Sequence, residues 1–240
     1  FKSNSAGTYQ WGRTYTLTGP VFDSHDAAVG VIEVAGGGYV FTGYVSENNG
    51  ADTTTDIILF KTDASGTLQW MKSFGNLGDN ESGQHLIELS NGDLLVAGWT
   101  DDVGLGNIFL MKTDASGNFI SATAYNVGTF FSPEVNSLVQ TASGDFAVFG
   151  WCATAAPPLF NYKPYLLKVN SSLAIQFTKH YNSQIGGFFV KGEEATSGGY
   201  IMGNMVGNVS WDLNLIKTDA NGVSGCNENN YSASAATYNP

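Results

Sequence analysis

The hexapeptide Lys61-Thr62-Asp63-Ala64-Ser65-Gly66 recurs along this chain. It returns almost unchanged as Lys112-Thr113-Asp114-Ala115-Ser116-Gly117 and again as Lys217-Thr218-Asp219-Ala220-Asn221-Gly222. Two more divergent copies are Lys2-Ser3-Asn4-Ser5-Ala6-Gly7 and Lys168-Val169-Asn170-Ser171-Ser172-Leu173. A motif that returns about every 50 residues indicates a repeat architecture.

The motif itself predicts a tight turn. The side chain of Asp63 is suited to accept hydrogen bonds from the backbone amides that follow it, and Gly66 tolerates a positive φ. These two properties favour a type I turn that joins two strands in a hairpin. Leu173 takes the place of the glycine in one copy, so we expect that turn to differ.

Four strand-like runs make up each repeat. In the second repeat they are residues 84–90, 93–100, 107–112 and 118–125. Each run is short, rich in β-branched or aromatic residues, and bounded by Gly, Asn, Asp or Ser, which is typical of strands and turns. No segment has a sustained apolar period of 3.6 residues, so we expect little or no helix.

A glycine recurs at one point of the second run, at Gly43, Gly98 and Gly150. In the last copy Gly203 comes one position early and Asn204 takes the aligned place. A glycine at a fixed point of a strand predicts a β-bulge or a close approach of another backbone segment.

Four-stranded repeats predict an all-β fold, specifically a β-propeller of four-stranded antiparallel blades. Counted on the sequence as given there are four blades, or more if the protein extends upstream. We expect the N-terminal run 8–15 to pair with residues 212–217 and so close the last blade. An open β-solenoid is a third choice, although its turns are usually much shorter than about 50 residues. The predicted division is a propeller over 1–228, with approximate repeats 8–66, 67–117, 118–173 and 174–222, and a C-terminal tail over 229–240.

The charge balance limits the classes of partner. With 10 basic and 21 acidic residues the formal charge is 10 − 21 = −11, and Arg13 is the only arginine. Nucleic acid and anionic membrane surfaces are therefore poor partners, because both need clustered Lys and Arg. No apolar run is long enough to predict a membrane span. A cation, or a basic or neutral surface, remains a candidate partner.

An acidic and amide column marks the end of the first run of each repeat, at Glu33, Glu88, Gln140 and Glu194. If the first strands are innermost, these side chains line a central channel and attract a cation or share protons. The alternative is an ordinary wet, polar channel without a function of its own.

An aromatic column follows the second-run glycine, at Tyr44, Trp99 and Trp151, with Met205 in the last copy. Exposed on one face, such rings are suited to stack on sugars or to fill a pocket in a partner. The alternative is that they pack between blades. A further column in the fourth run, Trp11, Trp70 and Phe177 with Ser121 as its weak member, is typical of blade core.

Metal and thiol chemistry have little support in the sequence. The repeated turn Asp63–Gly66 carries one acidic residue, whereas a calcium loop of the EF type needs several. Asp101-Asp102 and the loop 47–52 are richer in oxygen ligands. We therefore expect no cofactor, with calcium bound at these residues as the alternative. Cys152 and Cys226 are too few for a disulfide framework or a metal site; they either form one bridge or remain free thiols. His25, His85 and His180 have neither ligand nor triad spacing, and no known catalytic motif occurs.

The repeat resembles a known family. The pattern from Asp56 through the turn at Asp63–Gly66 to Trp70, followed by motifs of the Gly-Gly-Tyr-x-x-x-Gly type, is similar to secreted bacterial β-propeller repeat proteins, many of which precede a type IX secretion sorting domain. The resemblance covers residues 1 to about 228 and implies an extracellular or cell-surface location. It carries no catalytic residue to this chain, because the shared residues form turns and core.

Three hypotheses of function follow. The first is a non-enzymatic binding or scaffold module that presents loops to a glycan or a protein in adhesion or surface assembly. The second is a carbohydrate-active hydrolase with an acidic site at the channel, since a carboxylate pair can be assembled across blades. The third is a structural repeat of a larger surface filament or complex.

Overall fold

The structure is a computed structural model. It describes residues 1–15, 26–48, 53–76, 78–101, 107–128, 130–153, 155, 161–182, 188–206, 212–225 and 228–240. Within these ranges every helix or strand element is a β-strand, so the predicted all-β class is confirmed. No helix in the described part of the chain has the length and apolarity to cross a bilayer.

The strands form five separate antiparallel sheets. The N-terminal hairpin consists of β1 (Lys2–Ser3) and β2 (Tyr9–Trp11). Sheet I consists of β3 (Ala27–Glu33), β4 (Tyr39–Asn48), β5 (Thr53–Thr62) and β6 (Leu68–Phe74). Sheet II contains β7 (Glu81–Glu88), β8 (Leu94–Thr100), β9 (Asn107–Thr113) and β10 (Phe119–Asn126).

Sheets III and IV complete the series. Sheet III contains β11 (Phe130–Gln140), β12 (Phe146–Ala153), β13 (Tyr162–Val169) and β14 (Ile175–Tyr181). Sheet IV has three strands, β15 (Phe188–Glu194), β16 (Tyr200–Val206) and β17 (Asp212–Lys217). The four runs predicted for each repeat are thus confirmed as consecutive neighbours in sheets I to III, with boundaries within a few residues of those predicted for sheet II.

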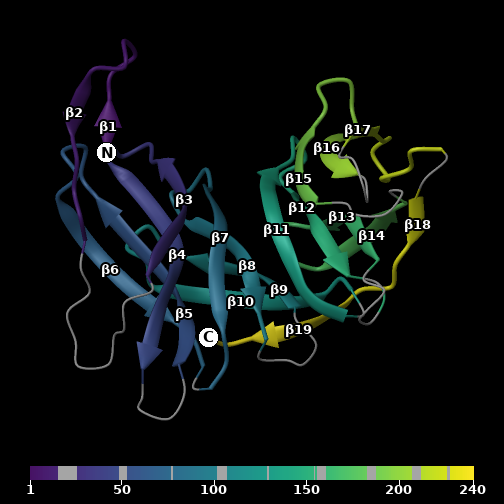
Figure 1. Ribbon diagram of the computed structural model, residues 1–240, viewed down its shortest axis with the longest axis horizontal. Helices are drawn as coiled ribbons and strands as arrows, with labels where there is room; N and C mark the ends of the chain where they lie inside the picture. Colours follow the sequence, from purple (N-terminus) through teal and green to yellow (C-terminus); the bar gives the residue numbers. More distant parts are fainter. Residues whose placement is uncertain are drawn as a thin grey trace.

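The C-terminal residues return to sheets formed earlier in the chain. Strand β18 (Glu228–Asn230) pairs with β14, and β19 (Ser234–Tyr238) pairs with β10. Figure 1 shows this yellow segment running from the edge of sheet III back to sheet II. Sheets II and III therefore each have five strands, and the stretch predicted as a tail contributes an edge strand to both.

The repeated motif forms the predicted turn. Asp63 Oδ1 accepts hydrogen bonds from the backbone N–H groups of Ser65 (2.8 Å) and Thr67 (2.9 Å). Gly66 has a φ of 79° and donates its N–H to the Asp63 carbonyl at 3.0 Å. The same side-chain bonds occur in the other four copies, with Asn in place of Asp in two of them, at Asn4, Asp114, Asn170 and Asp219.

The turn at Leu173 does not differ, so that prediction was wrong. Leu173 adopts a φ of 65°, close to the values of the turn glycines. A left-handed conformation strains a residue with a Cβ, and something must compensate for it. The packing of the turns on aromatic side chains, a second feature of the repeat, shows which interaction offsets this strain.

Three of the turns, at Gly66, Gly117 and Gly222, lie over an aromatic side chain of the preceding unit. A Cβ added to Gly66 would lie 2.7 Å from the Trp11 ring, and one added to Gly117 would lie 2.7 Å from the Trp70 ring. Where Leu173 replaces the glycine, the residue at the place of the tryptophan is Ser121. Leu173 is 95% buried and belongs to the core between sheets II and III. We infer that its side chain fills the space that an indole fills elsewhere, and that this burial offsets the backbone strain.

This compensation predicts coupling between residues 121 and 173. Leu173→Gly should lower the free energy of unfolding by about 1–2 kcal/mol, because lost burial outweighs relieved strain. Ser121→Trp alone should cost about 1–3 kcal/mol through overpacking. The double variant should be more stable than the sum of the two by at least about 1 kcal/mol, as measured by urea unfolding in a double-mutant cycle. Strict additivity would show that Leu173 does not occupy the indole space.

The second-strand glycines face a bulge, as predicted. Each first strand shifts register near its middle, for example between Gly83 and His85 in β7. The shift brings a backbone carbonyl onto the neighbouring strand, so that a Cβ on Gly98 would lie 1.9 Å from the Ser82 oxygen. Gly43 and Gly150 meet the equivalent carbonyls at 1.8 Å. Only a residue without a side chain fits there.

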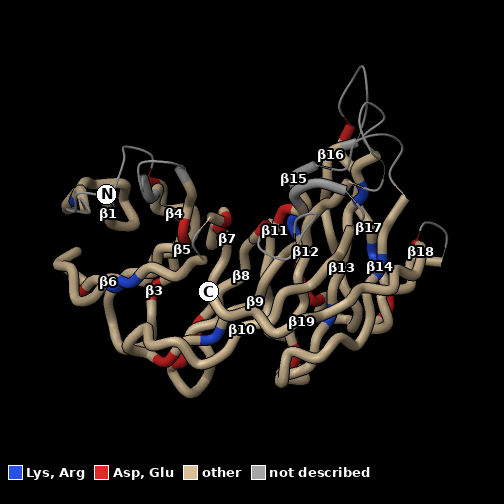
Figure 2. Tube along the Cα trace, turned by 90° about the horizontal axis from the view of Figure 1, so that it is seen from below, with Lys and Arg blue, Asp and Glu red and all other residues tan. Residues whose placement is uncertain are grey.

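Three hydrophobic clusters join successive sheets. One joins sheets I and II, one joins II and III, and one joins III and IV. The first strands β3, β7, β11 and β15 contact one another in that order. Sheets I and II and sheets III and IV form two lobes with an open space between the N-terminal hairpin and sheet IV (Figure 1). Figure 2 shows the same two groups, with β10 and β19 between them.

The predicted four-bladed propeller is wrong, because the five sheets remain separate and none is closed. Within the described residues β2 pairs with β1 and β17 pairs with β16, so residues 8–15 do not complete the last sheet as a closing strand. The N-terminal segment contacts sheet I instead of the last sheet. The Tyr15 hydroxyl donates to the Gly66 carbonyl at 2.7 Å, and Trp11 lies against Gly66. These contacts hold the N-terminal segment on sheet I.

Candidate functional site

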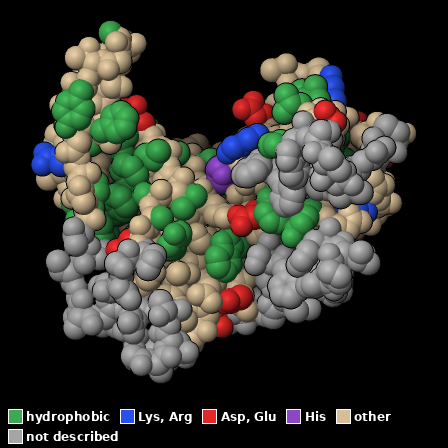
Figure 3. Space-filling view, in the orientation of Figure 1, with side chains coloured by type: hydrophobic (Ala, Val, Ile, Leu, Met, Phe, Trp, Pro, Cys, Tyr) green, Lys and Arg blue, Asp and Glu red, His purple; other side chains and the backbone are tan. Residues whose placement is uncertain are grey.

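A hollow between the two lobes is the candidate site. Figure 3 shows it with a histidine beside basic side chains at its floor. The first strands β7, β11 and β15 carry polar side chains that contact the neighbouring first strand, and β7 and β11 shift register beside these residues. We call the set formed by Gln84, His85, Glu134, Asn136 and Lys191 the central strip.

Hydrogen bonds connect the central strip across three strands. Gln84 Oε1 accepts the Val135 N–H at 2.7 Å, and Gln84 Nε2 donates to Glu134 Oε2. Lys191 Nζ donates to the Asn136 carbonyl at 2.6 Å, which joins β15 to β11. The side-chain oxygen of Asn136 is buried, and among the described residues it has no donor. An acceptor without a partner is costly for a folded protein, so Asn136 Oδ1 is a point at which a ligand can donate.

Burial sets the charge of the strip. It lowers the pKa of His85 to about 4, with the Lys191 ammonium acting in the same direction. It also lowers the pKa of Lys191 and raises that of Glu134, while the hydrogen bond from Gln84 opposes the change at Glu134. His85 is therefore neutral near pH 7. The strip consists largely of uncharged hydrogen-bonding groups with one ammonium and one carboxyl group.

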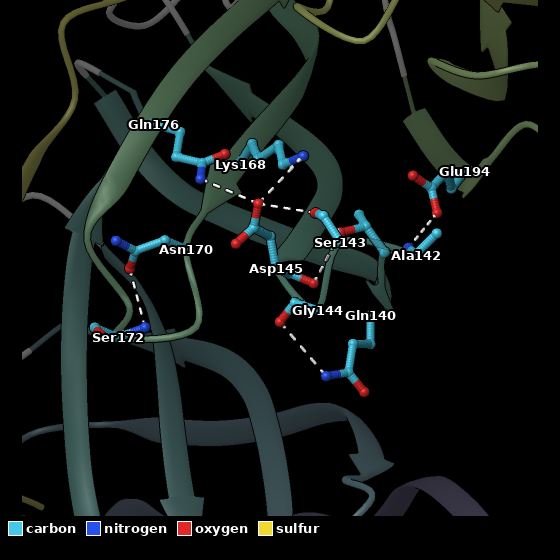
Figure 4. Close-up of polar contacts among 11 residues, drawn as sticks. Gln140, Ala142, Ser143, Gly144, Asp145, Lys168, Asn170, Ser172, Gln176 and Glu194 are labelled. Carbon is cyan, nitrogen blue, oxygen red and sulfur yellow. Dashed lines mark hydrogen bonds and ion pairs between the residues drawn. The ribbon is translucent and has the colours of Figure 1, made fainter.

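The predicted acidic column does not line a channel. Glu194 Oε2 accepts the backbone N–H of Ala142 at 2.7 Å (Figure 4), and Glu88 Oε2 accepts that of Ala35 at 2.7 Å. Each carboxylate thus caps the turn of the preceding sheet. Gln140 donates to the carbonyl of Gly144 in its own turn at 3.5 Å, and Glu33 is exposed. Glu88 and Glu194 thus link neighbouring sheets, and the structure does not bring the four members of the column together.

The aromatic column is half-buried at each of Tyr44, Trp99 and Trp151. Trp151 packs against the cluster between sheets III and IV and meets the edge of Tyr162 at 5.1 Å with an interplanar angle of 88°. Trp151 therefore packs between sheets, as in the alternative to an exposed binding surface. Tyr44 lies opposite Ala27 and Ile57 in the register of sheet I.

A groove of about 560 Å³ between the N-terminal hairpin and sheet I was missed from the sequence. Its lining includes the rings of Trp11, Tyr15, Tyr39, Phe41 and Phe60. Phe41 and Phe60 stack with centroids 4.6 Å apart. The spacing of Trp11 matched that of Trp70 and so indicated core. The sequence does not separate the two tryptophans in this respect, because Trp11 and Trp70 stand at the same place of the repeat.

Cys152 is a buried thiol next to a histidine. Its sulfur lies 3.6 Å from His180 Nε2 and 3.4 Å from the Val127 carbonyl, and the same imidazole nitrogen lies 2.6 Å from that carbonyl. Burial raises the pKa of the Cys152 thiol to about 12. A thiol that stays protonated is a poor nucleophile, so this pair is structural. Of the two alternatives for the cysteines, Cys152 is a free thiol in this structure, and Cys226 lies outside the described residues.

Glu81 is a buried carboxyl group at the start of β7. It is fully buried, and its Oε1 accepts from the Tyr238 hydroxyl at 3.2 Å and from the Asn76 N–H at 3.4 Å. No described residue donates to Oε2. Burial raises the pKa of Glu81 to about 8, and the carboxylates of Asp56 and Asp79 contribute in the same direction. Glu81 is therefore mostly protonated at neutral pH.

The candidate calcium loops are only partly described. Asp101 accepts the backbone N–H of Asn80 at 2.5 Å and the side-chain amide of Asn80 at 2.9 Å. Asp102 and residues 49–52 lie outside the described ranges. Within those ranges no group of three or more His, Cys, Asp and Glu side chains is placed to hold a metal ion. No protein-family model matches the chain, and no curated protein matches it.

Proposed function

We propose that this protein is a non-enzymatic, extracellular or cell-surface binding and scaffold module, whose partner is a glycan or a protein that lies along the central strip. The observation that carries the proposal is the buried acceptor Asn136 Oδ1, which has no donor among the described residues and lies in a strip of hydrogen-bonding side chains. A hydroxyl or amide group of a partner would supply the missing donor. The extracellular location rests on the resemblance of the repeats to secreted bacterial repeat proteins.

The geometry favours binding over hydrolysis. Glu88 and Glu194, the carboxylates considered for catalysis, cap backbone turns. The Cys152–His180 pair is buried, and its thiol stays protonated. The central strip, by contrast, is half-exposed and mostly neutral, which suits hydrogen bonding to a polyhydroxylated or peptide ligand.

The test separates binding from folding. Asn136→Ala removes an acceptor that has no partner in the described structure, so its free energy of unfolding should change by less than about 1 kcal/mol. In a glycan array, binding of the best glycan should fall at least about tenfold in Asn136→Ala and in Asn136→Ala/Lys191→Ala. Lys217→Ala, an exposed lysine on the Lys217–Gly222 turn, is the matched control and should bind as the wild type does. Equal binding by all four proteins would place the ligand elsewhere, and no binding by the wild type would exclude the glycan partner.

A further inference from the structure

Successive sheets pack through one recurring pair of faces. In sheet I the face that carries Ile57 and Leu59, which we call the trailing face, packs on the face of sheet II that carries Leu94 and Val96, which we call the leading face. The trailing face of sheet II, with Ile108 and Leu110, packs on the leading face of sheet III in the same way. Leu166 of sheet III packs on Tyr200 and Met202 of sheet IV.

The trailing face of sheet IV has no cover within the described structure. Leu213 and Leu215 take the places of Ile57 and Leu59, yet they are 92% and 70% exposed, whereas Ile57 and Leu59 are fully buried. With Gly203, Asn204, Met205 and Asn214 these two leucines line a groove of about 480 Å³. Exposed leucines at positions that are core in every other sheet indicate an interaction surface.

The leading face of sheet I is covered by no other sheet and only in part by the N-terminal segment, whose Trp11 and Tyr15 rings lie 6.0 Å from Tyr39 and 6.5 Å from Phe41. Val31 is 58% exposed, while Leu86 at the same place in sheet II is 5% exposed. Tyr39 and Phe41 are half-buried and line the aromatic groove beside the N-terminal hairpin. The two faces that no other sheet covers are thus the two halves of the interface that occurs three times inside the molecule.

We propose that a second copy of this chain covers these faces, with the trailing face of sheet IV in one copy packed on the leading face of sheet I in the next. The internal interfaces are the template, because every contact uses residues at equivalent repeat positions. Such an interface is heterologous, since each copy contributes a different surface. This self-association is independent of any ligand on the central strip.

The polar groups at the two end faces, on sheet I and sheet IV, are complementary in the same way. Glu88 caps the N–H of Ala35, and Glu194 caps that of Ala142, each in the preceding sheet. Glu33 is the equivalent glutamate of sheet I and is exposed, and Thr196 stands at the place of Ala35 in sheet IV. Across two copies, Glu33 of one therefore accepts the N–H of Thr196 of the other.

The strand edges are also complementary. In sheets I to III the third strand pairs with a fourth, whereas within the described residues β17 pairs only with β16. The N-terminal segment already occupies the position of a fourth strand. The Tyr15 hydroxyl donates to the Gly66 carbonyl in the same way as the hydroxyl of Tyr181, on the fourth strand of sheet III, donates to the Gly222 carbonyl. The second copy thus brings its residues 12–15, which lie in no strand, beside β17.

Sedimentation equilibrium over a range of protein concentrations tests the proposal. Wild type should associate, and association should strengthen with added salt, because each copy carries a formal charge of −11 and salt screens the repulsion between like charges. Leu215→Asp and Val31→Asp should each weaken self-association by about 100-fold or more. Thermal unfolding of each variant at low concentration should match that of the wild type, because both side chains are exposed in the single chain.

Mixing the two variants decides between a heterologous interface and any other. Leu215→Asp keeps an intact leading face, and Val31→Asp keeps an intact trailing face. The mixture should therefore form a one-to-one dimer with about the wild-type affinity, although neither variant associates alone. A mixture that stays monomeric, or a wild type that is monomeric at the highest concentration measured, would overturn the proposal.

Discussion

Gly98→Ala should lower the free energy of unfolding by more than about 3 kcal/mol, or prevent folding altogether. The added Cβ would lie 1.9 Å from the Ser82 carbonyl oxygen and 2.6 Å from the Phe109 ring. A backbone oxygen in a bulge cannot move away without breaking the pairing of β7 with β8. Urea unfolding at 25 °C measures the effect.

Gly203→Ala is the matched control for this substitution. Gly203 lies in the second strand of sheet IV, where an added Cβ would meet nothing nearer than the Asn214 carbonyl at 3.9 Å. Its free energy of unfolding should change by less than about 1 kcal/mol. If both variants lost the same stability, or if Gly98→Ala were as stable as the wild type, the bulge would not be what requires glycine at this point of the repeat.

Glu81→Gln should remove a large part of the pH dependence of stability. In the unfolded chain Glu81 has a pKa near 4.5, and in the folded protein its pKa is about 8. The stability that this group contributes is therefore fully present below pH 4.5 and is lost as the pH rises to about 8, at up to about 1.4 kcal/mol per pH unit. At pH 8.5 the variant should be about 4–5 kcal/mol more stable than the wild type, and at pH 4.5 the two should be nearly equal.

Comparing the wild type with Glu81→Gln separates the contribution of Glu81 to the pH dependence of stability from that of the other titrating groups. Urea unfolding of wild type and Glu81→Gln is measured from pH 4.5 to 8.5, with Glu193→Gln as the control. Glu193 is exposed on β15, so its substitution should change stability by less than about 0.5 kcal/mol at every pH. A constant gap between wild type and Glu81→Gln across the range would contradict the raised pKa of Glu81.

The local structure was predictable because its causes are local. Asp63 and Gly66 specify their turn through hydrogen bonds and φ within six residues. The recurrence of Gly98 at one strand position predicted the bulge, since a backbone approach leaves no other residue type. The all-β class and the sequential order of the strands followed from the same short-range patterns.

The arrangement of the sheets was not predictable in this way. The repeat shows which faces pack together, but the angle between successive sheets decides whether the ends meet, and no single motif encodes that angle. The acidic column illustrates the same limit. Glu88 and Glu194 recur at one position, which indicates a shared environment, and only the packed sheets show that this environment is the neighbouring turn. Leu173 is a third case, because its compensating partner Ser121 lies 52 positions earlier and on another sheet.

Disulfide crosslinking of Glu33→Cys/Thr196→Cys tests most directly whether the four sheets form an open array whose ends pair between copies. Cys226→Ser in the same protein removes a competing thiol. The structure predicts disulfide-linked species larger than one chain, which become fewer as the protein is diluted before oxidation. A disulfide within single chains that persists on dilution would show that the two ends of one chain meet, and would contradict the open array.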